Sequence, residues 1–138
     1  MTREQIQKII DQVPTLNSFG IGVSDLIRDE RERLDTLESG KRSLLDSAEA
    51  CTKCCEWLQN VEKTKAINDH ANSYGLKHVA EVDIGYITNG SFIAAAIHSG
   101  FEYNVTPGSP NVTFNMSTGS INDIKRRQKA EGKTNWVI

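Results

Sequence analysis

The chain has 138 residues, a quarter of them charged, and a formal net charge of -2 at pH 7. This length suits one hydrophobic core, so we expect a single domain over residues 1–138. The slightly acidic balance argues against a protein whose whole surface binds nucleic acid or anionic lipid. No apolar run reaches the roughly 18 residues of a membrane span, and the first residues are too polar for a signal peptide, which predicts a cytoplasmic protein without membrane contact.

The first predicted helix starts after Thr2, a good N-cap residue, and stops before Pro14, which cannot continue the helical hydrogen bonds. Its apolar face consists of Ile6, Ile9, Ile10 and Val13. Residues 15–22 then form a connector between this helix and the next one.

The clearest pattern in the chain is an apolar seam with alternating spacings of three and four residues. It consists of Val23, Ile27, Leu34, Leu37, Leu44, Ala48, Cys51, Cys55 and Leu58. Such a heptad seam predicts one long helix or two stacked helices that pack along their length against another helix. Gly40 beside Lys41 marks the point where we expect the helix to be weakest. An uncovered seam would also support self-association, so we expect a homo-oligomer.

All three cysteines, Cys51, Cys54 and Cys55, fall within one predicted helical turn, and no other cysteine exists to pair with them. A zinc site would need two further ligands, and a redox motif would need a strand before the helix. We therefore expect buried structural cysteines and no metal.

The second half of the chain predicts shorter elements. The seam ends near Asn60, residues 68–73 favour turns and caps, and Ser73 is the expected cap of a helix that ends at Gly85. Thr88 or Asn89 then caps a short helix that is apolar nearly all round, which predicts burial, and Gly100 closes it. Alternating residues on either side of the turn at 107–110 predict a two-stranded hairpin. Ser120 is the expected cap of the last helix, with Ile121 and Ile124 facing inward. The expected fold is α+β, mostly α.

Four stretches of the chain carry a resemblance to known proteins. They are SYGLKHVAE at residues 73–81, GYITNGSFIAAA at 85–96, CEWL at 55–58 and SPN at 109–111. Together they resemble small uncharacterised bacterial proteins, some of which are carried on integron cassettes and plasmids. The resemblance covers residues 44–117 and implies an accessory protein of mobile elements. It implies no activity and no catalytic residue.

Ser73, Tyr74, Lys77 and His78 form the most promising polar cluster. They combine cationic groups, a phenol and an expected helix N-terminus, where free N–H groups and the helix dipole favour an anion. This predicts a site for a small anionic ligand or an acidic partner. The alternative is an ordinary solvated turn. His78 and Glu81 share a helix face, but two such residues alone predict a structural histidine before a metal site or a general base.

The strongest local charge excess lies in the last helix, at Lys125, Arg126, Arg127 and Lys129. These cations could contact nucleic-acid phosphates, or they could be a solvated face that stabilises the end of its helix.

No motif indicates a catalytic residue, a metal site or a cofactor. The favoured function is therefore a non-catalytic interaction or ligand-binding module, with the cluster around Tyr74 and His78 as its site. The alternative is a nucleic-acid-binding accessory protein that acts through its basic last helix. An enzyme ranks third.

Overall fold

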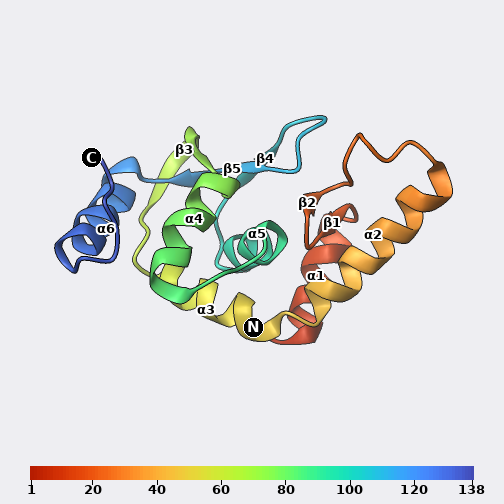
Figure 1. Cartoon of the computed structure of the whole chain (residues 1–138), viewed down its shortest axis with the longest axis horizontal. Helices are drawn as coiled ribbons and strands as arrows, with labels where there is room; N and C mark the ends of the chain where they lie inside the picture. The colour runs from red at the N-terminus through yellow and green to blue at the C-terminus, as the bar shows by residue number, and fades with distance from the viewer.

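The computed structural model describes residues 1–138 and contains six helices and two small antiparallel sheets, so the fold is α+β and mostly α (Figure 1). The helices are α1 (Arg3–Gln12), α2 (Glu30–Leu45), α3 (Ala48–Leu58), α4 (Ser73–Ile84), α5 (Asn89–His98) and α6 (Thr118–Ala130). The strands are β1 (Leu16–Asn17), β2 (Gly20–Ile21), β3 (Lys63–Asn72), β4 (Tyr103–Val105) and β5 (Val112–Met116). None of the helices combines the length and apolar character that crossing a membrane requires.

Helix α5 lies at the centre of the molecule. It packs against α1, α3, α4 and the β1–β2 hairpin, and Figure 1 shows these elements around it. Its residues from Asn89 to Ala96 are all buried, as its all-round apolar sequence predicts. One cluster of 27 buried apolar residues includes members of every helix, so the core is continuous from α1 to α6.

The first helix agrees with its prediction. Thr2 and Gln5 form a reciprocal capping box, in which each side chain accepts a hydrogen bond from the other residue's backbone N–H. The apolar residues of the predicted face are buried, and the helix ends at Gln12, just before Val13 and Pro14.

The seam predicted over residues 23–58 falls on two consecutive helices, α2 and α3, only from Leu34 onward; Val23 and Ile27 precede α2 and are not helical, so that part of the prediction is wrong. The break lies at Asp46 and Ser47, so the expectation that the helix is weakest at Gly40 is wrong. Gly40 is needed for a different reason: a Cβ on it would lie 2.5 Å from Oδ1 of Asn17, so the glycine lets α2 pack closely on β1. Seam residues Leu44 and Cys51 are buried in the chain's own core.

Residues 68–73, which predicted turns and caps, lie mostly in the ten-residue strand β3, so the turn prediction is wrong. The sequence did not indicate this strand because its residues do not alternate: its register against β5 shifts twice, half of its residues are exposed and only Ala71 is buried. The predicted hairpin of β4 and β5 is confirmed, but it forms part of a three-stranded sheet of order β3-β5-β4.

Two predicted helix caps are also wrong. Asn72, one residue before Ser73, caps α4, and Ser117 caps α6 in place of Ser120. Both of the predicted serines are buried and accept hydrogen bonds from other elements: Ser73 from the N–H of Val112, and Ser120 from the N–H of Glu62. The sequence pattern cannot distinguish these roles, because a serine can cap its own helix or link it to a neighbouring segment.

Candidate functional site

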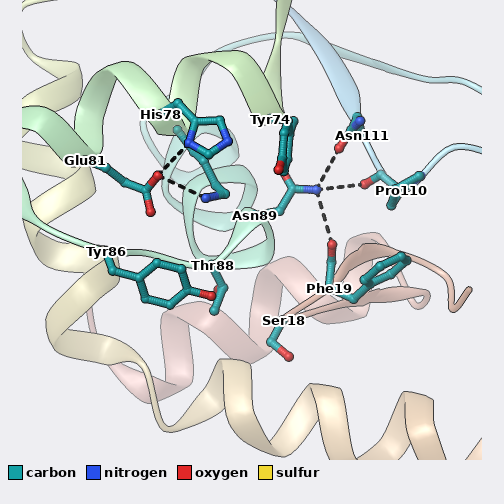
Figure 2. A pocket seen from close by; sticks show the side chains of 11 residues that line it. Ser18, Phe19, Tyr74, His78, Glu81, Tyr86, Thr88, Asn89, Pro110 and Asn111 are labelled. Carbon is teal, nitrogen blue, oxygen red and sulfur yellow. Dashed lines mark hydrogen bonds and ion pairs between the residues drawn. The ribbon is translucent and has the colours of Figure 1, made fainter.

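A cleft of about 700 Å³ opens beside α4, at the start of α5, and we call it the α4–α5 cleft. Besides these helices, the β1–β2 turn and the segment before β5 form its walls (Figure 2). The lining residues are Ser18, Phe19, Tyr74, Lys77, His78, Glu81, Tyr86, Thr88, Asn89, Pro110 and Asn111. Its volume lies within the range of sites that hold small molecules.

The structure brings three of the four predicted ligand-binding residues into this cleft. Tyr74, Lys77 and His78 lie on one face of α4, together with Glu81, because residues three and four apart on a helix share a face. Ser73 does not line the cleft, since it is buried against β5. The candidate site is therefore a helix face and not the free N-terminus of α4, where Asn72 already binds the N–H of Tyr74.

Glu81 organises the polar groups on this face. One carboxylate oxygen lies 3.1 Å from Nζ of Lys77 and 2.9 Å from Nδ1 of His78, and the other accepts a hydrogen bond from the N–H of Ile87 at 3.2 Å. Burial alone would raise the pKa of Glu81, but the Ile87 N–H and the Lys77 ammonium group outweigh it and lower the pKa. At neutral pH, the charges of Lys77 and Glu81 therefore cancel.

Two tyrosine rings flank the ammonium group of Lys77. Its Nζ lies 5.4 Å from the ring centroids of both Tyr74 and Tyr86, within the range of a cation–π contact. The ring of Tyr74 also packs edge-on against His78, with centroids 4.5 Å apart. Lys77 is only 6% exposed, whereas Tyr86 is 82% exposed. Large aromatic surface is therefore available at the mouth of the cleft, above a buried cation.

Asn89 links the walls of the cleft. Its Nδ2 donates to the carbonyl oxygens of Phe19 and Pro110, both at 3.2 Å, and to Oδ1 of Asn111 at 2.9 Å (Figure 2). These three acceptors fix the orientation of the carboxamide, because a flipped amide would place oxygen against oxygen. Its Oδ1 is buried and accepts no hydrogen bond. An unpaired buried acceptor is costly and rare in folded proteins, so it marks a point for a ligand donor.

Several cleft residues were not identified as site residues from the sequence. Glu81 was recognised only as a helix-face partner of His78. Tyr86, Asn89 and Asn111 come from three separate segments, and nothing in their local spacing indicates a shared site. The one available signal was Tyr86, an aromatic residue in a short connection between two helices, where an exposed ring is unusual.

Most of the cations that were predicted to bind nucleic acid make contacts with neighbouring side chains. Arg126 pairs with Asp123, Arg127 pairs with Asp83 and Glu131, and the ammonium group of Lys125 lies 5.2 Å from the centroid of the Trp136 ring. Lys129 makes no ion pair. The cations of α6 therefore support the fold of the C-terminal segment.

Asp83 is the centre of that network. Its carboxylate accepts hydrogen bonds from Arg127, Gln128, Lys133 and the indole N–H of Trp57. Burial would raise the pKa of Asp83, but these donors outweigh it and hold the pKa far below its usual value. This cluster joins α3, α4 and α6 and leaves the carboxylate little capacity for a ligand.

Two of the three cysteines are buried, as expected, whereas Cys55 is only partly buried. Cys51 and Cys54 are fully buried, and burial raises the pKa of both thiols, which keeps them protonated and unreactive at neutral pH. No group of three or more histidine, cysteine or acidic side chains is arranged to hold a metal ion.

Comparison of the chain with known protein families, with curated proteins and with solved structures gave no match. The case for a function therefore depends on the geometry of the chain itself.

Proposed function

We propose that this protein is a non-catalytic module that binds a small polar ligand in the α4–α5 cleft. The observation that carries the proposal is the combination in one cleft of exposed tyrosine rings and the unpaired, buried Oδ1 of Asn89. Aromatic surface gives a ligand contact area, and a few fixed polar groups orient it, which is the usual composition of a small-molecule site.

The anionic ligand expected from the sequence is a weaker candidate for this cleft. Lys77 is buried and paired with Glu81, so an anion gains little net attraction and approaches a carboxylate. A ligand with hydrogen-bond donors has two acceptors to pair with, Asn89 Oδ1 and the Glu81 carboxylate. The resemblance to accessory proteins of mobile elements stays a hypothesis, since no comparison bears on it.

Nucleic-acid binding by α6 remains the alternative, but no feature of the structure favours it. Most of its cations already pair with acidic side chains or pack on an aromatic ring. Releasing them would cost the contacts that hold α6 in place.

A screen of small polar ligands by thermal shift, followed by calorimetry on each hit, tests the proposal. Replacing Tyr74 by alanine should weaken binding about tenfold, since one aromatic contact contributes up to roughly 1.5 kcal/mol. Tyr74 is half exposed, so the variant should keep its fold. Leu34→Ala, an exposed apolar residue on α2 outside the cleft, is the control and should leave binding unchanged. Equal affinities for the Tyr74 variant and the wild type would place the ligand elsewhere.

A further inference from the structure

The polar groups of the α4–α5 cleft restrict the chemistry of its ligand. Oδ1 of Asn89 accepts no hydrogen bond, although the residue is only 6% exposed and lines the cleft. Figure 2 shows its carboxamide in the middle of the cleft, between Tyr74 and the carbonyl of Phe19. Beside it, the ammonium group of Lys77 donates one N–H to Glu81 and makes cation–π contacts with the rings of Tyr74 and Tyr86. The ligand must therefore donate to an amide oxygen and can accept from an ammonium group.

Neither kind of charged ligand meets these conditions. An ionised carboxylate only accepts hydrogen bonds, so it would leave Asn89 Oδ1 unpaired, and a carboxylate or a phosphate would bring its negative charge against the Glu81 carboxylate. A cationic ligand would meet Lys77, which already occupies the position near both tyrosine rings and pairs with the acid. A neutral ligand avoids both conflicts.

A hydroxyl group is neutral and both donates and accepts hydrogen bonds. Several hydroxyls on one ring can pair with Asn89, Glu81 and Lys77 at once, because these groups lie around a single cleft. The apolar face of the same ring can then pack on a tyrosine, and Tyr86 offers a ring that is 82% exposed.

We infer that the ligand is a neutral, saturated ring that carries several hydroxyl groups, packed on Tyr86 and donating to Asn89. This inference rests on the proposed function and narrows it to one chemical class. A free sugar or cyclic polyol and the ribose of a nucleoside share this chemistry, and the experiment must separate them.

Calorimetry at pH 7 with three sets of probes tests the inference. The first set contains pyranose sugars and inositol with their single-deoxy analogues, the second contains ribonucleosides paired with 2′-deoxyribonucleosides, and the third contains inorganic phosphate and acetate. We expect a member of the first or second set to bind, the loss of one particular hydroxyl to weaken it at least tenfold, and the third set not to bind. Deoxy probes test the Asn89 contact without a substitution at Asn89, whose Nδ2 holds three segments together.

Two variants locate the binding. Tyr86→Ala should weaken it at least tenfold, whereas Tyr86→Phe, which keeps the ring and removes only the hydroxyl, should bind within about threefold of the wild type. Phosphate or acetate that binds as tightly as any hydroxylated ring would overturn the ligand class but leave the proposed binding function intact. Nucleosides that bind equally with and without the 2′-hydroxyl, while free sugars do not bind, would assign the site to the base and also overturn the inference. If no probe and no other polar ligand binds, both proposals fail.

Discussion

At the scale of single residues, two partly buried carboxylates of α4, Glu81 and Asp83, differ in how open they are to a ligand. Glu81 pairs with Lys77 and His78 but lines an open cleft, whereas Asp83 is saturated by donors from α3, α6 and the C-terminal segment. Two residues apart on one helix, they point to different sides of α4. Glu81 therefore belongs to the candidate site, and Asp83 belongs to the framework that supports it.

Replacing Asp83 by asparagine should lower the free energy of unfolding at pH 7 by about 2 kcal/mol, because hydrogen bonds between charged groups are lost and Arg127 and Lys133 lose their partner. Because folding lowers the pKa of Asp83, its contribution is complete above the unfolded value of about 3.9 and is lost as the pH falls below it. Urea denaturation between pH 3 and 7 should therefore show a smaller pH dependence in the variant.

Asp123→Asn is the matched control for this measurement. Asp123 also pairs with an arginine of α6, but it is exposed, so its loss should cost less than about 1 kcal/mol. Equal effects of the two substitutions would show that the Asp83 cluster does not stabilise the fold.

At the scale of elements, close approach between helix and hairpin shapes the first third of the chain. Asn17, almost fully buried, donates to the carbonyl oxygens of Thr15, Gly20 and Gly22 and so holds the β1–β2 turn. Gly40 of α2 packs against this side chain, and its carbonyl accepts from the N–H of Ser18. The turn that α2 supports also supplies Phe19, whose carbonyl accepts from Asn89 in the cleft.

Two glycine substitutions should consequently have opposite effects on stability. Gly40→Ala should destabilise the protein by about 1–2 kcal/mol, since overpacking against Asn17 outweighs the gain of about 1 kcal/mol in helix propensity. Gly75→Ala in α4 meets open space and should stabilise it by up to about 1 kcal/mol. Urea denaturation of both variants measures the difference, and a stabilised Gly40 variant would contradict the packing argument.

At the scale of the whole molecule, the seam divides into a covered and an open part. From Leu44 onward it contributes to the core, whereas Leu34 near the start of α2 is 63% exposed. Figure 1 shows this half of α2 extending away from the other helices. Self-association stays a proposal, and the open part of the seam is where a second copy would have to pack.

We expect Leu34→Glu to shift the protein from a dimer to a monomer in sedimentation equilibrium at micromolar concentration, because it places a charge on the open seam. The melting temperature of the monomer should hardly change, since the side chain has little core contact. Leu26→Glu, a fully exposed leucine outside the seam, should leave association unchanged. A monomeric wild type under the same conditions would disprove the proposal.

The sequence by itself determined the elements whose signals are local. The capping box of α1, the all-round apolar α5, the hairpin before α6 and the burial of Cys51 and Cys54 follow from propensity and periodicity. The closeness of Tyr74, Lys77 and His78 in the sequence predicted a shared site, but at a helix N-terminus and not on the helix face where the structure places it. Helical spacing identified His78 and Glu81 as neighbours.

Only the tertiary structure decided the features that join distant segments. Strand β3 exists because it pairs with β5, and its irregular register left no alternation in the sequence. The hydroxyl of Ser73 binds strand β5 and does not cap its helix, a choice that depends on what packs beside it. Asn89 belongs to the site because the fold brings two distant carbonyls to it: that of Phe19 in the β1–β2 turn, 70 residues away, and that of Pro110 before β5, 21 residues away. Such contacts depend on how helices pack, which local residue spacing does not encode.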